Sequence, residues 1–318
     1  MIFLSGNVCT CVNCTRQFTQ MSYISEEWQV ARRRKGASGK FKSHQVPLNS
    51  PSCLQEQLDV GKLIRRIRDN MFELKYEDFW KEWNKHFLAA AASLKPPEDN
   101  DTENQLEKVP EEKHPQQLTC VCYGLGSFSS CVAARYQLAM LLLLLDARQI
   151  LLQDCHVYDP AFSSAEKDVL RELGLTVLTE NEEGKRLATK PTLFYLMHCG
   201  KALYNNLLWK NWSIQSLSQV LIIGNGFNGI KERTIERELK RDYSYISKAV
   251  DLCEERLLPC PSHLIDVFSD TAVITFPSES LNRLSQSFWE EPAEPRYLHC
   301  SDLEITLRES ETLLTGDR

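Results

Sequence analysis

Residues 117–290 alternate short apolar runs with longer segments in which apolar residues recur at helical spacing. Five apolar runs predict buried strands: 117–123, 155–160, 175–178, 191–200 and 219–227. Three segments between them predict helices: 129–145, 163–173 and 201–212, the second ended by Gly174. Strands that alternate with helices predict an α/β, Rossmann-like fold, with a mostly parallel sheet, right-handed crossovers and helices on both faces.

The last part of this region follows a different pattern. A long polar helix is predicted over about Lys231–Leu257. The runs 263–268 and 271–277 predict two late strands that pair as an antiparallel hairpin through Ser269-Asp270.

The most apolar stretch, Leu138 to Leu152, is interrupted by Asp146 and Arg148 and is too short to span a bilayer. We therefore expect a buried helix and no membrane insertion.

An N-terminal helical extension is predicted over 54–94. Phe79, Trp83 and Phe87 fall four residues apart and so share one face of the helix. Such a stripe typically docks on the protein's own core, and a groove for a partner is the alternative.

Composition predicts how the rest of the chain is organised. We expect a disordered tail over 1–53, an acidic linker with several prolines over 95–116, an α/β domain over 117–290 and a loosely ordered acidic tail over 291–318.

Two features of the first segment allow a second interpretation. Cys9, Cys11 and Cys14 would suggest zinc but lack a fourth ligand, so no metal site is predicted. The six positive charges of Arg32–Lys42 are typical of a nuclear-import or anion-binding segment, or of a solvated linker.

Charge and cysteine content bear on two questions: whether the protein binds nucleic acid, and in which compartment it is found. The net charge is -6 and charged residues make up 25%, which argues against nucleic acid as a partner; a salt-sensitive contact through Arg32–Lys42 is the remaining route. The chain has 12 cysteines, and its first residues lack the pattern of a signal peptide. We therefore expect reduced thiols and a location in the cytoplasm, the nucleus or both.

Polar or glycine-rich residues follow four of the predicted strands. In chain order they are Gly124, Gly126 and Ser127, then Asp159, then His198 and Cys199, then Asn225. Ligands of open α/β sheets bind outside the carboxyl ends of the strands, so these residues predict a small-molecule site on one shared rim.

The glycine turn "CYGLGSFSSC", 122–131, allows two interpretations. Glycines and free amides at the start of a helix attract a phosphate, and the turn is also similar to that of S-adenosylmethionine-binding domains. The dinucleotide fingerprint matches only in part, because Ser129 replaces its third glycine and Asp159 comes late. A tight turn that serves packing alone is the alternative.

The other rim residues are open to two interpretations as well. Asp159 either binds a ribose or caps the turn into the next helix. His198 either contacts a ligand or is a packed histidine, and it makes a poor dyad with Cys199 because neighbours on a strand point to opposite faces. Asn225 either binds a ligand or occupies a turn with positive φ.

Taken together, the blocks "VCYGLGSFSSC", "VYDPAFS", "TLFYLMHCGKALYNNLLWKNW", "LIIGN" and "DVFSDTAVITFP" resemble the Sensitivity to Red Light Reduced (SRR) family over about residues 55–285. The resemblance implies a regulatory protein linked to the circadian clock and to haem biosynthesis. The family has no assigned reaction. Its recurring blocks contain eight residues of interest here: Gly124, Gly126, Ser127, Asp159, His198, Cys199, Asn205 and Asn225.

Two functions are carried forward. The first is a regulatory protein with a ligand at the rim, unnamed protein partners and no turnover. The alternative is a nucleotide- or S-adenosylmethionine-dependent enzyme in which His198 is the acid or base and Asp159 holds the cofactor. Haem, a nucleotide and S-adenosylmethionine are the candidate ligands.

Overall fold

The computed structural model describes residues 59–94, 118–290, 293–300 and 303–308. The cysteine cluster, the basic segment and the acidic linker of the sequence analysis lie outside these residues. Within them, no helix is both long enough and apolar enough to cross a membrane.

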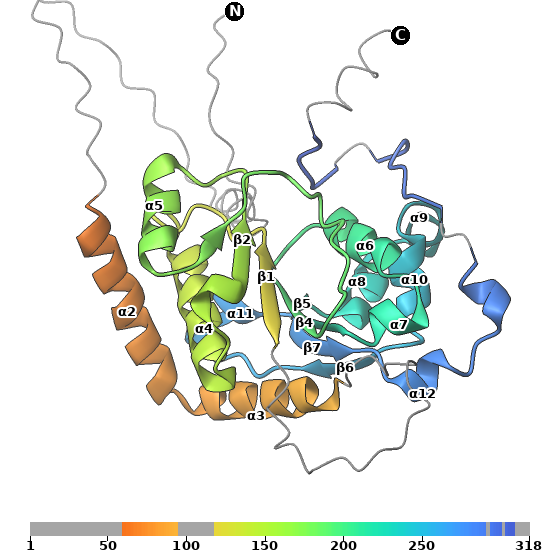
Figure 1. Cartoon of the computed structure of the whole chain (residues 1–318), viewed down its shortest axis with the longest axis horizontal. Coiled ribbons are helices and arrows are strands. Elements are labelled where there is room, and N and C mark those ends of the chain that lie inside the picture. The colour runs from red at the N-terminus through yellow and green to blue at the C-terminus, as the bar shows by residue number, and fades with distance from the viewer. Residues whose placement is uncertain (1–58, 95–117, 291–292, 301–302, 309–318) are drawn as a thin grey trace, which may run out of the picture.

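A seven-stranded sheet forms the centre of the molecule (Figure 1), in the order β3-β2-β1-β4-β5-β7-β6. Its strands are β1 (Thr119–Tyr123), β2 (Cys155–Tyr158), β3 (Thr176–Val177), β4 (Thr192–Leu196), β5 (Val220–Asn225), β6 (Glu254–Leu257) and β7 (Thr271–Thr275). The first five are parallel, whereas β7 runs antiparallel to both β5 and β6. The predicted mostly parallel α/β sheet with a late antiparallel pair is confirmed.

Helices cover both faces of this sheet. One face carries α2 (Val60–Tyr76), α3 (Asp78–Ser93), α4 (Val132–Arg148), α5 (Ser164–Glu172) and α11 (Ile265–Phe268). The other carries α6 (Lys201–Lys210), α7 (Ile214–Leu217), α8 (Phe227–Arg233), α9 (Glu236–Asp242), α10 (Ser244–Ala249) and α12 (Ser278–Leu281). Short 3-10 turns lie at η1 (Leu152–Asp154), η2 (Ser262–Leu264) and η3 (Gln286–Phe288).

The two-residue period of the strands divides the core. In β1, Cys120 and Cys122 belong to the cluster beneath α4, while Val121 and Tyr123 belong to the cluster beneath α6. Both faces of the strand are buried, which explains why its sequence is an unbroken apolar run.

The central helix α4 is the predicted buried helix. Its residues from Leu138 to Leu145 are all buried, because α2 and α3 cover the side that faces away from the sheet. It ends at Gln149, which adopts the left-handed conformation that commonly closes a helix.

The predicted N-terminal helix is two helices, since the backbone is extended at Glu77. Phe79 and Trp83 pack against Phe268 of α11, with ring centroids 5.8 and 5.2 Å apart. The Trp83 indole also donates a hydrogen bond of 2.8 Å to the Pro259 carbonyl. The aromatic stripe therefore docks on the core, and the partner-groove interpretation of it is wrong.

The predicted polar helix over Lys231–Leu257 is wrong. The segment holds α8, α9, α10 and then strand β6. Thr234 and Tyr243 leave helical geometry between the helices, which lets Leu239 and Ile246 each reach the core. β6 lies at the edge of the sheet, where charged side chains are typical, so its polar sequence resembles an exposed helix.

The predicted hairpin between 263–268 and 271–277 pairs the wrong segments. Residues 262–268 form η2 and α11, and the antiparallel neighbours of β7 are β5 and β6. Leu264, Val267 and Phe268 are all buried. Their spacing of three and four residues is helical, a period that the short apolar run concealed.

Candidate functional site

The turn after β1 is shaped by two glycines with positive φ, Gly124 at 67° and Gly126 at 78°. The backbone nitrogen of Gly126 donates a hydrogen bond of 2.7 Å to Oδ2 of Asp159, and the Ala161 nitrogen donates one of 2.7 Å to Oδ1. Asp159 is only 3% exposed. Its carboxylate thus closes the turn from inside the protein.

A second carboxylate, that of Glu166, lies where this turn leads into α4. Oε1 accepts hydrogen bonds of 2.8 Å from Ser127 Oγ and from the Ser129 nitrogen. Oε2 accepts bonds of 2.9 and 3.0 Å from the nitrogen and hydroxyl of Ser163. The amides and hydroxyls that were expected to bind a phosphate therefore hold the protein's own anion.

Burial acts differently on these two carboxylates. It raises the pKa of Asp159, and the bonds from Ala161 and Gly126 compensate only in part. Burial also opposes ionisation of Glu166, but the donors on Ser129, Ser163 and Ser127 outweigh it and lower the pKa of Glu166. The local donors therefore favour the ionised form of Glu166, whereas burial disfavours the ionised form of Asp159.

The glycine turn after β5 repeats the arrangement. The Asn228 nitrogen, at the start of α8, donates a hydrogen bond of 3.0 Å to Oε2 of Glu255 on β6. A Cβ on Gly226 would lie 2.7 Å from the other oxygen of Glu255. At both glycine turns, a carboxylate of this chain takes the place of an external anion.

The switch point of the sheet lies between β1 and β4, because the chain continues to β2 on one side and to β5 on the other. Cys199 fills this position: its Sγ donates to the Tyr123 carbonyl at 3.3 Å, and a Cβ on Gly124 would lie 2.4 Å from it. Burial raises the pKa of Cys199, which keeps the thiol protonated. Cys199 is thus a packing group rather than a nucleophile.

His198 lies in the turn just after β4, which ends at Leu196 and not at His198-Cys199 as predicted. Its φ is 52°, in the left-handed region. Nε2 lies 3.0 Å from the Ser269 carbonyl, so it carries the proton, and Nδ1 accepts from Gln137 Nε2 at 3.3 Å. Burial lowers the pKa of His198. These contacts are those of a packed, hydrogen-bonded histidine.

Asn225 ends β5 beside Tyr204. The Tyr204 hydroxyl accepts a hydrogen bond of 2.8 Å from the Asn225 nitrogen, and its one proton lies between the Leu196 carbonyl and Asn225 Oδ1, the latter at 3.0 Å. Asn225 is not among the residues with positive φ, so the turn interpretation of it is wrong. Within the described residues its Nδ2 has no hydrogen-bond partner, which leaves one donor available at this edge.

Asn205 has a different role. It is buried in α6, and its Oδ1 accepts from the Tyr245 and Ile246 nitrogens at 3.0 and 3.3 Å, which holds the start of α10. Its Nδ2 donates to the Tyr297 hydroxyl at 3.2 Å. These bonds connect α6 to α10 and to the C-terminal segment, and none of them reaches the glycine turns.

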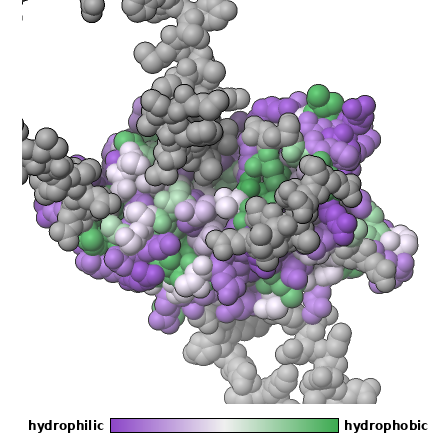
Figure 2. All heavy atoms as spheres, turned by 90° about the horizontal axis from the view of Figure 1, so that it is seen from above, coloured by the Kyte–Doolittle hydropathy of each residue, from purple (hydrophilic) through white to green (hydrophobic). Residues whose placement is uncertain are grey.

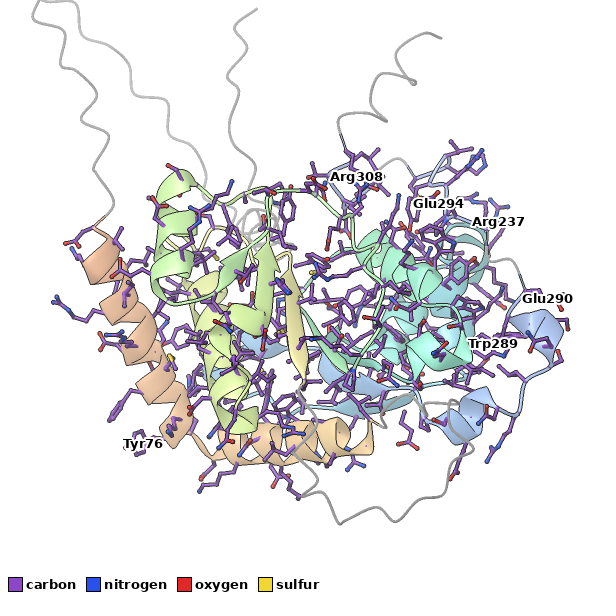
Figure 3. The ribbon with its side chains drawn as sticks, viewed as in Figure 1. Tyr76, Arg237, Trp289, Glu290, Glu294 and Arg308 are labelled. Carbon is purple, nitrogen blue, oxygen red and sulfur yellow. The ribbon has the colours of Figure 1, made fainter. Side chains whose placement is uncertain are left out.

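The C-terminal segments 293–300 and 303–308 lie against α6 and the loop before β4. The Tyr297 hydroxyl bonds to Ala202 and Asn206 at 3.1 and 2.7 Å. The Arg308 nitrogen donates to buried Glu183 at 2.6 Å, near the upper edge in Figure 3. The acidic composition of 291–318 did not indicate these contacts; the rest of that segment lies outside the described residues.

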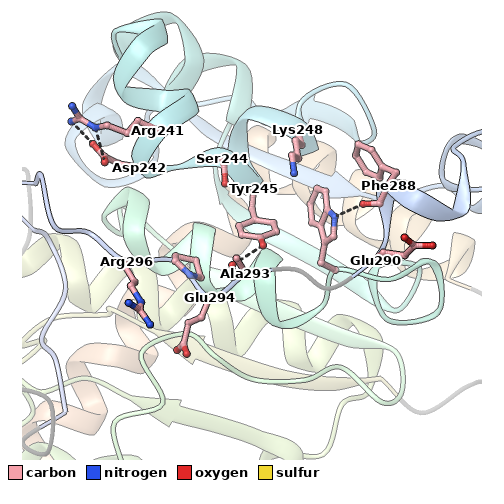
Figure 4. Close-up of a pocket in the computed structure, with 12 residues that line it drawn as sticks. Arg241, Asp242, Ser244, Tyr245, Lys248, Phe288, Glu290, Ala293, Glu294 and Arg296 are labelled. Atoms are coloured by element: carbon pink, nitrogen blue, oxygen red, sulfur yellow. Dashed lines mark hydrogen bonds and ion pairs between the residues drawn. The ribbon is translucent and has the colours of Figure 1, made fainter.

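A pocket of about 330 Å³ lies away from the glycine turns, where α10 meets residues 288–290 and 293–296 (Figure 4). The rings of Trp212 and Tyr245 meet edge-on there, with centroids 5.0 Å apart. The Lys248 ammonium lies 5.6 to 5.8 Å from the centroids of these two rings and of Phe288. The pocket's aromatic wall therefore already holds a cation of the chain. None of the residues that line it was predicted as a site residue from the sequence.

The carboxyl edge of the sheet, seen from above in Figure 2, presents hydrophilic surface with smaller hydrophobic areas in the described residues. Sequence reasoning missed Glu166, Glu255 and Tyr204 at this edge. The spacing Ser163-x-x-Glu166 is a capping-box signature and could have placed Glu166 at the start of α5. Nothing in the sequence signals that Glu255 caps α8, because β6 reaches α8 only through the sheet.

The residues present do not fit the candidate ligands. A ribose needs a carboxylate that it can reach, and Asp159 is buried with each oxygen bonded to a backbone nitrogen of the protein. Haem iron needs a free histidine nitrogen or a thiolate, and His198 and Cys199 offer neither. No group of three or more metal-ligating side chains gathers in the part of the chain that the structure describes.

Comparison with known proteins gives consistent matches. The SRR1 domain model matches residues 101–275. The SRR1-like protein of Mus musculus is 41% identical over 243 residues, which cover 71% of this chain and 95% of that protein. The SRR1-like protein of Drosophila melanogaster is 30% identical over 275 residues, covering 85% and 90%.

A plant protein matches as well. Protein SENSITIVITY TO RED LIGHT REDUCED 1 of Arabidopsis thaliana is 32% identical over 209 residues, covering 65% of this chain and 74% of that protein. No solved structure matches significantly. The extent of the domain match and the identity to the two animal proteins show that this chain belongs to the SRR1 domain family.

Proposed function

We propose that this chain is a regulatory protein of the SRR1 domain family that acts by binding and performs no catalytic turnover. One observation carries the proposal: Glu166, Asp159 and Glu255 occupy the positions at which a Rossmann-like enzyme would bind phosphate and ribose. The protein thus has the Rossmann-like fold of nucleotide-dependent enzymes, but its own carboxylates fill the positions at which such enzymes bind an anion.

The family resemblance supports the biological setting. The printed name of the Arabidopsis relative refers to sensitivity to red light. We place the action of this chain in clock-related gene regulation and in the regulation of haem biosynthesis, in the cytoplasm and the nucleus. The setting rests on the resemblance, whereas the proposal of binding without turnover rests on the geometry.

The small-molecule site of this proposal centres on Asn225. The amide of Asn225 has a donor to offer, and the Glu255 carboxylate of edge strand β6 lies against the start of α8, just after Asn225, whereas Asp270 is already paired with Arg233 at 3.0 Å. A donor beside a carboxylate favours a neutral ligand with a carbonyl or hydroxyl acceptor and disfavours a phosphate. Gly124, Gly126, Ser127, Asp159, His198 and Cys199 form the closed wall of the rim rather than direct contacts.

The enzyme alternative has no support in the comparisons or in this geometry. It requires His198 as acid or base and Asp159 as cofactor ligand. The polar atoms of both side chains already form hydrogen bonds inside the protein. Asp159 is buried and His198 is half-buried, so a ribose or a proton would have to displace those bonds.

The test identifies small molecules that copurify with the full chain by mass spectrometry and then measures each by thermal shift. Asn225→Asp is the informative variant, because it keeps the acceptor for Tyr204 and replaces the amide donor. Asn282→Asp, an exposed position at the C-terminal end of α12, is the matched control.

We expect a ligand that is recovered unchanged, raises Tm in wild type and Asn282→Asp, and fails to do so in Asn225→Asp. Steady turnover of any copurified compound would overturn the proposal. So would a ligand that binds through a phosphate group.

A further inference from the structure

The outer face of α2 carries an aromatic pair that the fold does not use. Phe72 and Tyr76 are 66% and 73% exposed, and their ring centroids lie 4.6 Å apart. Figure 3 shows Tyr76 pointing away from the body of the protein. The opposite face of α2 packs on α4 and α5, so the exposed rings are not needed to hold the helix in place.

The same helix concentrates positive charge. Five of its residues are exposed cations, and none forms an ion pair within the described residues: Lys62, Arg65, Arg66, Arg68 and Lys75. The helix also holds two acids, Asp69 and Glu73, the second of which accepts a hydrogen bond of 2.6 Å from Tyr136, so five positive formal charges face two negative ones. The whole chain has a net charge of -6, so this helix is a local positive area on an acidic protein.

Helical geometry places these groups on one stripe. Arg65, Arg68, Phe72 and Tyr76 follow each other at intervals of three and four residues, which keeps them on one face. With a rise of about 1.5 Å per residue, the stripe is about 16 Å long. Positive charge lies toward its N-terminal end, and the aromatic pair lies at its C-terminal end.

We propose that this stripe, the α2 surface, binds an acidic peptide segment of a partner protein that also carries an apolar side chain. Arginine and aromatic residues are the side chains that contribute most to protein interfaces, because they combine a polar tip with a large contact area. The cations attract the acidic part of the segment, and the Phe72–Tyr76 pair contacts its apolar residue. This interaction goes beyond the proposed function, which concerns the sheet edge.

A nucleic acid fits this surface less well. Beyond Tyr76 the charges are balanced by the pairs Lys81–Asp78 and Lys85–Glu82, at 2.9 and 3.3 Å. The unpaired positive charge is therefore confined to the 17 residues of one helix, whereas a phosphate backbone needs a longer continuous basic track. A short peptide with acids at one end and an apolar residue at the other matches both ends of the stripe.

Fluorescence anisotropy of the full chain tests the proposal. The probe is a fluorescein-labelled synthetic peptide in which a run of glutamates is followed by leucine and phenylalanine. The variants are Phe72→Ser with Tyr76→Ser, and Arg65→Glu with Arg68→Glu. Arg237→Glu, an exposed cation on α9, is the control for charge reversal elsewhere (Figure 3).

Each double variant should bind the peptide at least about tenfold more weakly, while Arg237→Glu binds as wild type does. All variants should keep the wild-type Tm within a few degrees, because the changed side chains are exposed. A uridine-rich RNA strand and anionic lipid vesicles are measured in parallel. The proposal is overturned if the peptide does not bind, if its binding ignores the α2 variants, or if the RNA or the vesicles bind more tightly through these residues.

Discussion

Asp159 Oδ2 lies 2.7 Å from the backbone nitrogen of Gly126, and this hydrogen bond joins the ends of β1 and β2. A ligand phosphate or ribose would have to break it. The Glu166 carboxylate accepts the same kind of hydrogen bond from the backbone nitrogen of Ser129, further along the same turn. The glycine turn that suggests a nucleotide site in the sequence is therefore a corner fastened by internal carboxylates.

Substitution of the two glycines should separate backbone strain from steric overlap. Gly126→Ala places its Cβ 3.9 Å from the nearest side chain, so it should cost only the left-handed strain of about 1 kcal/mol in the free energy of unfolding. Gly124→Ala adds an overlap with Cys199 Sγ at 2.4 Å and should cost clearly more. Urea unfolding measures both.

A double variant checks the cause of that difference. Cys199→Ala removes the sulfur, so it should recover most of the extra loss in Gly124→Ala and none of the loss in Gly126→Ala. Equal losses for the two glycine variants would contradict the contact between Gly124 and Cys199.

Glu166→Gln should destabilise the protein by about 3 kcal/mol, because an amide nitrogen would face hydrogen-bond donors in a buried site. The pKa of Glu166 is lowered in the folded state, so its ionised form stabilises the fold above the ordinary glutamate pKa. This contribution is lost as the pH falls through the folded pKa. Unfolding at neutral pH should therefore show the largest gap between wild type and variant.

The control for this prediction lies on the same helix. Glu172 is exposed at the end of α5 and makes no ion pair in the described part of the chain. Glu172→Gln should leave the free energy of unfolding within about 0.5 kcal/mol of wild type. A similar loss in both variants would mean that Glu166 is an ordinary surface acid.

Stability should depend on the protonation of His198. Burial lowers its pKa in the folded protein, while the unfolded chain keeps the ordinary value of 6.5. As the pH falls below that value, the unfolded state takes up the proton first and stability decreases. The contribution is complete above the unfolded pKa, and protonation would also remove the acceptor for Gln137.

His198→Asn isolates this effect, because asparagine tolerates the left-handed φ but does not titrate. Its stability should change less between pH 7 and pH 5 than that of wild type. His156 and His86 also have lowered pKa values but are present in both proteins, so they cancel in the comparison. Parallel pH profiles would count against a neutral, bonded His198.

Tyr297 should hold the C-terminal segment onto α6. Tyr297→Phe removes the hydroxyl that bonds to Ala202 and Asn206 and should cost about 1 to 2 kcal/mol. The variant should also be cleaved faster than wild type near residues 293–300 in limited proteolysis. A cleavage pattern identical to wild type would show that the segment is held by other contacts.

The sequence predicts the parallel half of the sheet well, because β1, β4 and β5 are buried on both faces and appear as apolar runs. It fails at the antiparallel end. β6 is a charged edge strand that resembles a helix, and the run at 264–268 is a short helix that resembles a strand. Tertiary pairing decides both cases, and no local pattern reports it.

The position of the candidate site could be predicted from the sequence, but whether the site is open to a ligand could not. Topology brings Gly126 and Asp159 together at one edge, as the sequence suggests. It does not reveal that both oxygens of Asp159 are already bonded, or that Glu255 reaches α8 from a distant strand. Whether a rim is open or closed depends on such contacts between segments far apart in sequence.

Isothermal titration calorimetry of the full chain with ATP, NAD and S-adenosylmethionine tests the central claim that the carboxyl edge is closed by Asp159, Glu166 and Glu255. We predict no saturable binding of any of the three. Saturable binding that disappears in Asp159→Asn or Glu166→Gln, with the fold intact, would contradict the claim and restore a nucleotide site at this turn.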